Sequence, residues 1–222
     1  MQQSFEQWGL PKSIKVDNGK PFGDPQRSSV PVLALWLIGL GVEVIWNPPR
    51  SPRANAKVER MQGTTSRWVE IEQCLSYEHL QDKLNQVAKL QREQYEVRRL
   101  GGQSRKEYYP QLWTNTRHYD KEAFEVRKVY AYLKEVAFVR KVNQRGAFNF
   151  YAHKVYLGPA HRNKTISLRY SIPDNSFIIT DQSNTNIASL KADNFTKEYL
   201  ISLSVCQNKY VKCCNFMSPP IG

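Results

Sequence analysis

Two acidic residues, Asp17 and Glu59, stand where they could act together on a metal ion or a phosphate. Asp17 follows the alternating residues of "SIKV" and begins an Asp-Asn-Gly turn signal, so we expect it at the end of a short strand. Glu59 lies in the first turn of a predicted helix. Two-metal phosphoryl transfer needs carboxylates that converge from separate elements, because Mg²⁺ keeps several waters. The alternative is structural, with Asp17 as a turn residue and Glu59 as a solvated helix residue.

A basic, proline-rich loop precedes Glu59. The stretch "NPPRSPRANAK" covers residues 47–57 and carries the arginines Arg50 and Arg53. Its prolines limit the entropy that the loop loses on ordering, and its arginines are suited to phosphate contacts. The alternative is a solvated loop with no ligand.

A β-α-β pattern is predicted to position the two acids. Ile14 and Val16 alternate as in a strand, a helix follows from about residue 31 to residue 40, and "VEVIW" reads as a second strand after Gly41. After the loop, apolar residues recur at helical spacing and leave Glu59 on another face. These apolar residues are Val58, Met61, Thr65, Trp68 and Val69.

The rest of the chain changes character twice. A further helix is predicted from about Tyr77 to Arg98, ended by Gly101 and Gly102. Residues 103–130 lose clear periodicity and mix aromatic with basic residues, as in a linker or a segment that follows DNA. Short β-rich runs separated by turn residues then predict a small antiparallel barrel. The buried positions predicted for the helix are Leu80, Leu84, Val87 and Tyr95.

The charge of the chain favours a polyanionic partner. The 222 residues include 32 Lys and Arg against 20 Asp and Glu, a net charge of +12. Such a balance favours nucleic acid through phosphate neutralisation and counterion release. The alternative is a basic surface without a specific partner.

Compartment and redox state follow from what the sequence lacks. The longest apolar run, residues 30–46, is interrupted by Gly39, Gly41 and Glu43 and is too short for a membrane span. The N-terminal residues do not resemble a signal peptide, so we expect a cytoplasmic protein without a membrane partner. No pair of cysteines has the C-x-x-C spacing, so we expect reduced thiols. The cysteines are Cys74, Cys206, Cys213 and Cys214.

The order of these motifs resembles a known family. "VDNGKPF", a helix, a strand and then "NPPRSPRANAKVERMQGT" is similar to the second and third blocks of the integrase and transposase core, a ribonuclease-H-like family with a D, D, E triad. Asp17 matches the second acid and Glu59 the third, within a stretch that resembles the S-P-x-x-N-(A/G)-x-x-E signature. "YEVRRLGGQSRKEYYPQL" also resembles the end of this core in insertion-sequence transposases. The resemblance covers roughly residues 8–195.

The sequence departs from the family pattern at three places. Only Glu6 precedes Asp17 among acidic residues, so the first acid and its strand are missing and we expect an N-terminally truncated core. Residues 18–58 separate the two acids, a longer spacing than usual, which places an insertion around "GDPQRSS" with Asp24 as the nearest spare acid. Gly63 and Ser66 replace the basic residues usual after the glutamate.

The resemblance implies a fold and a site. The fold class is α/β, a partial ribonuclease-H-like core followed by a small all-β SH3-like barrel. The expected domains are a partial catalytic core (1–98), a basic linker (99–130), a β-barrel (131–195) and a tail (196–222). Asp17 and Glu59 are the catalytic and metal-binding candidates, with Mg²⁺ or Mn²⁺ as cofactor and double-stranded DNA as partner of a homo-multimer when full length. The predicted DNA-contacting residues are Arg50, Arg53, Asn55, Lys57, Arg60, Arg67, Arg98, Arg99 and Arg105.

Three functions stay open at this point. The first is DNA integration by strand transfer, as in a transposase, with two metal ions at the phosphodiester. The second is a catalytically inactive remnant that still binds DNA. The third is a protein-interaction module, because small barrels also bind peptides.

Overall fold

The computed structural model describes residues 1–19, 21–23, 30–151 and 153–202 of the chain. The chain divides into two compact units, one formed by residues 1–24 and 42–123 and the other by residues 25–41 and 124–222. The spare acid Asp24, most of the "GDPQRSS" stretch and three of the four cysteines lie outside the described residues. Cys74 is a free thiol. No helix among the described residues is long and apolar enough to cross a membrane.

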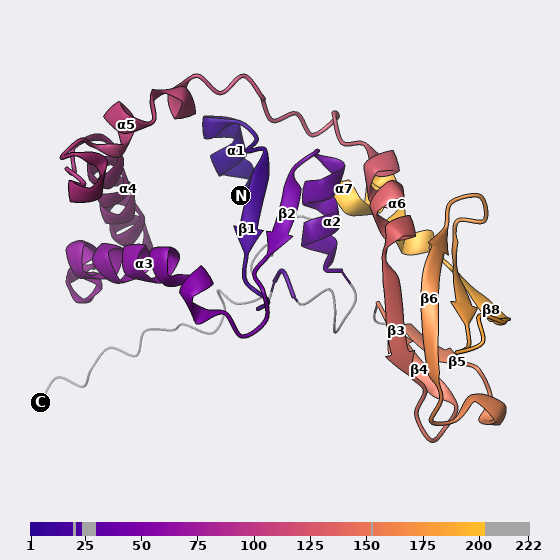
Figure 1. The fold of residues 1–222 in the computed structure, drawn as a ribbon. Coiled ribbons are helices and arrows are strands. Elements are labelled where there is room, and N and C mark those ends of the chain that lie inside the picture. The colour runs from indigo at the N-terminus through magenta and orange to yellow at the C-terminus, as the bar shows by residue number, and fades with distance from the viewer. Residues whose placement is uncertain (20, 24–29, 152, 203–222) are drawn as a thin grey trace, which may run out of the picture. The chain divides into compact units, whose positions relative to one another are not determined.

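The first unit combines helices with a small parallel sheet (Figure 1). Its two strands pair in parallel from Ser13 opposite Glu43 to Val16 opposite Trp46. Helix α2 (Val32–Gly39) lies between the two strands in sequence, so the predicted β-α-β order is confirmed. The elements are α1 (Gln2–Trp8), β1 (Ser13–Val16), β2 (Glu43–Trp46), η1 (Pro52–Ala54), α3 (Ala56–Val69), η2 (Ile71–Gln73), α4 (Tyr77–Glu93), η3 (Arg98–Leu100), α5 (Arg105–Tyr108) and η4 (Pro110–Trp113).

Two helices of this unit differ from their predictions. The apolar residues of α3 remain largely exposed, with Val58 and Met61 each about half exposed, and only Val69 is buried. Helix α4 ends at Glu93 and not near Arg98, because the N–H groups of Gln94 and Tyr95 both donate to the Leu90 carbonyl and the helix does not continue. Tyr95 therefore lies beyond the helix and is exposed, whereas Val87 is buried as predicted.

The second unit contains the antiparallel strands that the sequence predicts. Four strands form a sheet in the order β3-β6-β7-β8, and β4 and β5 form a separate hairpin. Antiparallel β structure is thus confirmed, and closure as an SH3-like barrel stays a prediction. The elements are α2 (Val32–Gly39), α6 (Val126–Glu135), β3 (Ala137–Lys141), β4 (Ala147–Phe150), β5 (His153–Tyr156), η5 (Pro159–His161), β6 (Thr165–Ser171), β7 (Ser176–Thr180), β8 (Asn186–Lys191), η6 (Asp193–Phe195) and α7 (Lys197–Ile201).

An aromatic core fills this unit. The rings of Phe138, Phe150 and Phe177 meet edge to face at centroid distances of 4.9 to 5.9 Å. Tyr151 packs against the same rings and donates its hydroxyl to the Val30 carbonyl at 2.8 Å. Burial raises the pKa of the Tyr151 hydroxyl. Edge-to-face pairs add about 0.5–1.5 kcal/mol beyond burial, so this cluster is a main source of the unit's stability.

Helices cover this core where the sequence predicted a linker or a tail. Helix α6 lies within and beyond the predicted linker, and it packs against α2 and β6. Its buried residues Val129 and Leu133 are one helical turn apart, as in an amphipathic helix. Helix α7 occupies the start of the predicted tail and buries Leu200 completely.

Candidate nucleic-acid interface

Asp17 lies at the end of β1, as predicted. Its side chain is exposed, and its Oδ1 accepts the N–H of Gly19 at 3.2 Å. This bond is the turn geometry expected of an Asp-Asn-Gly sequence. The carboxylate therefore has a local structural role at this turn.

Glu59 lies in the first turn of α3 and is exposed. Its backbone N–H donates to the Asn55 carbonyl at 3.0 Å, which closes the first turn of the helix. The N-terminus of a helix carries a partial positive charge, so a carboxylate is favoured there even without a ligand. Its position thus fits both a metal ligand and a helix-stabilising residue.

A chain of asparagine side chains connects the neighbourhoods of the two acids. Asn18 donates through Nδ2 to the Asn47 carbonyl at 3.0 Å, and Asn47 donates through its own Nδ2 to Oδ1 of Asn55. Asn47 is buried at the end of β2 and Asn55 precedes α3. The chain therefore joins the ends of both strands to the start of the helix that carries Glu59. Sequence reasoning missed the roles of Asn18 and Asn47. The predicted DNA contact of Asn55 stays a prediction, and its Oδ1 accepts the hydrogen bond from Asn47.

The acids alone do not form a metal centre. Within the described parts of the chain, no three His, Cys, Asp or Glu side chains come together to hold one metal ion. Mg²⁺ needs a nearly octahedral set of oxygens, and two exposed carboxylates organise such a set poorly. Asp17 and Glu59 therefore supply too few ligands to organise a Mg²⁺ or Mn²⁺ ion by themselves, and the cofactor stays a prediction.

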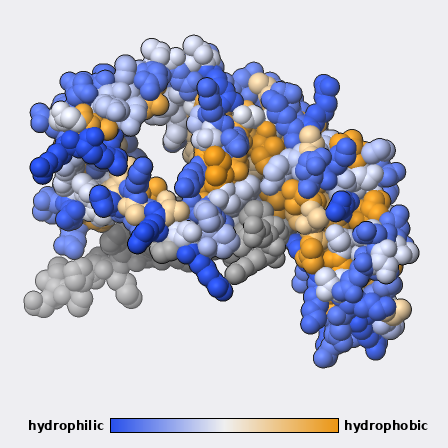
Figure 2. All heavy atoms as spheres, viewed as in Figure 1, coloured by the Kyte–Doolittle hydropathy of each residue, from blue (hydrophilic) through white to orange (hydrophobic). Residues whose placement is uncertain are grey.

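Five of the predicted DNA-contacting residues surround a single groove. The groove has a volume of about 290 Å³ and lies between α3, the end of α4 and the segment from Val97 to Arg105. None of the described residues that line it is acidic. Figure 2 shows a mainly hydrophilic surface over α3 and α4. The cations are Lys57, Arg60, Arg98, Arg99 and Arg105, and we call this site the basic groove.

Buried polar contacts hold the walls of the basic groove together. Gln91 on α4 is buried and donates through Nε2 to the Thr65 hydroxyl on α3 at 3.0 Å. The Arg105 guanidinium donates to the Gln91 carbonyl at 2.6 Å, so Arg105 has a structural role beside its charge. The indole of Trp68 meets the ring of Tyr95 at a centroid distance of 5.1 Å. Sequence reasoning missed the parts played by Gln91 and Thr65, since nothing in their spacing marks a contact across 26 residues.

A helix start fixes the backbone beside the groove. Ser104 and Glu107 form a capping box, in which each side chain accepts the other's backbone N–H, at 3.2 and 2.7 Å. The bond from the Ser104 backbone N–H, together with the neighbouring Ser104 side chain, lowers the pKa of the Glu107 carboxyl. Gly101 and Gly102 have positive φ, as the preceding turn requires. The capping box therefore orients Arg105 into the groove wall.

The remaining predicted residues do not line the groove. Arg50 lies in the loop before α3, with a positive φ of 56°, and Arg53 lies in η1. Both side chains are exposed. Arg67 is also exposed and donates through Nε to the Gly63 carbonyl at 3.2 Å on its own helix. Any DNA contact of these three arginines would extend beyond the groove.

No protein-family model matches the chain.

Proposed function

We propose that this chain is a DNA-binding protein of the transposase and integrase type and that the basic groove contacts the phosphates of duplex DNA. The observation that carries the proposal is the gathering of Lys57, Arg60, Arg98 and Arg99 with Arg105 around one cavity whose described lining includes no Asp or Glu. Phosphate contacts from Lys and Arg supply most of the affinity for DNA without regard to sequence. The net charge of +12 supports the same partner.

Strand transfer is the reaction of this class, and Asp17 and Glu59 are the residues proposed to serve it. The asparagine chain supports a shared position near the start of α3. Because the described residues supply no third metal-holding group beside them, we propose that the chain binds DNA but does not join DNA ends by itself. A homo-multimer and a metal-loaded site remain proposals that depend on further segments or chains.

Fluorescence anisotropy with a labelled 25-base-pair duplex tests the proposal. Arg98→Ala with Arg99→Ala removes two exposed cations from the groove and should weaken binding by about 10-fold or more at low salt. The matched control is Lys89→Ala with Lys121→Ala, which removes the same charge from exposed positions of the first unit outside the groove. Equal weakening by both pairs would show that only the net charge acts. Absence of duplex binding at low salt would favour a protein-interaction module.

A further inference from the structure

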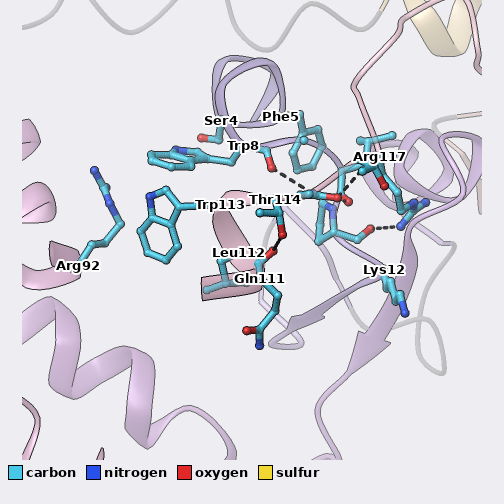
Figure 3. A pocket seen from close by; sticks show the side chains of 15 residues that line it. Ser4, Phe5, Trp8, Lys12, Arg92, Gln111, Leu112, Trp113, Thr114 and Arg117 are labelled. Atoms are coloured by element: carbon cyan, nitrogen blue, oxygen red, sulfur yellow. Dashed lines mark hydrogen bonds between the residues drawn. The ribbon is translucent and has the colours of Figure 1, made fainter. Parts of the chain in front are cut away.

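The first unit contains a second cleft, which is larger than the basic groove and shares no lining residue with it. Its volume is about 800 Å³, within the range of about 300–1,000 Å³ typical of ligand pockets. Gln91 lines the basic groove, whereas the next residue, Arg92, lines this cleft. The end of α4 thus supplies a wall to both sites. We call the second site the aromatic cleft (Figure 3).

Two tryptophans form the centre of the aromatic cleft. Trp8 of α1 and Trp113 of η4 meet edge to face, with centroids 6.2 Å apart. The Arg92 guanidinium lies 4.8 Å from the centroid of Trp8, and the Lys106 ammonium lies 5.9 Å from that of Trp113. Figure 3 shows the Arg92 side chain reaching toward the two indoles. Flat aromatic surfaces beside cations are suited to a ligand in which an aromatic ring that can stack is attached to an anionic group.

The far wall of the cleft is held by a set of backbone-directed bonds. Asn115 donates through Nδ2 to the carbonyls of Trp8 and Leu10 at 3.0 and 3.2 Å. The Arg117 guanidinium donates to the Pro11 carbonyl at 2.6 Å. A Cβ at Gly9, whose φ is 76°, would lie 2.7 Å from the Asn115 amide, so only glycine permits this approach. The cleft is therefore preformed, which lowers the entropy lost when a ligand binds.

The charged residues among the described lining of the cleft are all basic, namely Lys12, Arg92 and Arg117. Lys106 lies outside this lining and forms an ion pair with Glu93 at 4.0 Å. The Arg117 guanidinium is engaged by the Pro11 carbonyl, whereas Lys12 is exposed. The Nε of Arg92 is buried and has no hydrogen-bond partner within the part of the chain that the structure describes. An anionic ligand with a flat ring would complement these groups.

We propose that the aromatic cleft binds an unstacked nucleotide of single-stranded DNA, with its base against Trp8 and Trp113 and its flanking phosphates near Arg92 and Lys12. This inference rests on the proposed function, because the adjoining basic groove is what favours a phosphodiester chain over an acidic peptide. Base stacking on aromatic side chains tolerates any sequence, since every base has a flat face. The cleft would thus hold a frayed or overhanging end beside a duplex.

The test compares two labelled 15-mers of equal charge, oligo-dT and the same backbone without bases. The wild-type chain should prefer oligo-dT by about 5- to 150-fold, the range expected for one stacked base. Trp113→Leu should reduce this preference to within twofold, and Trp113→Tyr should restore part of it, which excludes simple unfolding. Tyr77→Leu is the matched control, because it removes a 62% exposed aromatic ring from the other end of α4. It should keep the full preference.

Duplex binding, measured on the same samples, separates this inference from the proposed function. Salt-dependent duplex binding without any preference for oligo-dT over the abasic strand would overturn the inference and leave the proposed function standing. A preference that depends on Trp113, without duplex binding, would support the cleft and contradict the basic groove. Displacement of oligo-dT by a 15-residue polyglutamate at equal concentration would overturn the inference in favour of an acidic peptide site.

Discussion

Gly39→Ala should destabilise the second unit strongly. Gly39 is the last residue of α2 and is buried. A Cβ at this position would lie 2.1 Å from Cε2 of Phe124 and 2.4 Å from Cζ. The Phe124 ring is 3% exposed, and the neighbouring Glu125 N–H donates to the Gly39 carbonyl at 2.9 Å. Neither the ring nor the helix end can therefore move freely.

The expected loss follows from these contacts. Overpacking of a core commonly costs about 1–3 kcal/mol. Alanine regains at most about 0.5–1 kcal/mol of backbone entropy relative to glycine in a helix. Because contacts of 2.1 and 2.4 Å require a rigid ring to shift, we expect a cost at the upper end of this range and a net loss of about 2 kcal/mol in the free energy of unfolding.

Urea unfolding followed by circular dichroism measures this loss, and hydrogen exchange locates it in peptides that cover α2 and α6. The matched control is Gly63→Ala in α3, where an added Cβ meets nothing within 4 Å. That variant should be stabilised by about 0.5–1 kcal/mol. An unchanged or higher unfolding midpoint for Gly39→Ala would refute the packing of Phe124 on α2.

Three further results are expected. Burial raises the pKa of Tyr170 to about 12. The neutral hydroxyl therefore contributes fully to stability below pH 10, and this contribution is lost as the pH rises through 12. The urea midpoint should fall between pH 10 and 12, and it should fall less in Tyr170→Phe. Asn47→Ala should lower the free energy of unfolding by about 1–3 kcal/mol, because it removes the hydrogen bond between the buried Asn47 side chain and Oδ1 of Asn55. Equal urea midpoints for the wild type and the variant would contradict the asparagine chain. The purified chain should not join a pre-cut DNA end to a plasmid in the presence of Mg²⁺ or Mn²⁺. Joining that disappears in Glu59→Gln would contradict this expectation, because it would show that the chain alone carries out strand transfer.

Local signals in the sequence predicted much of the fold. The strands at residues 13–16 and 43–46, the helix between them and α3 each carry a strong local pattern, and all are present. Helix α6 was missed, although Val126, Val129, Tyr130 and Leu133 recur at helical spacing within it. Its start lies in a stretch that mixes basic and aromatic residues, which obscured the period.

The site was predictable in its residue types but not in its assembly. Basic residues near α3 and after α4 were predicted to contact DNA, and five of them share one groove. Their gathering depends on contacts between distant residues, such as Gln91 with Thr65 and Arg105 with Gln91. The aromatic cleft depends in the same way on Trp8 and Trp113, which are far apart in sequence. Tertiary packing, and not local pattern, determines these contacts.

The salt dependence of duplex DNA affinity tests the role of the basic groove most directly. Each phosphate neutralised by Lys or Arg contributes about −0.9 to the slope of log affinity against log salt concentration. A variant with Lys57, Arg60, Arg98 and Arg99 all replaced by alanine should therefore have a slope shallower than the wild type by about 3 to 4 units. Equal slopes for the two proteins, at any affinity, would contradict the claim that the groove contacts DNA phosphates.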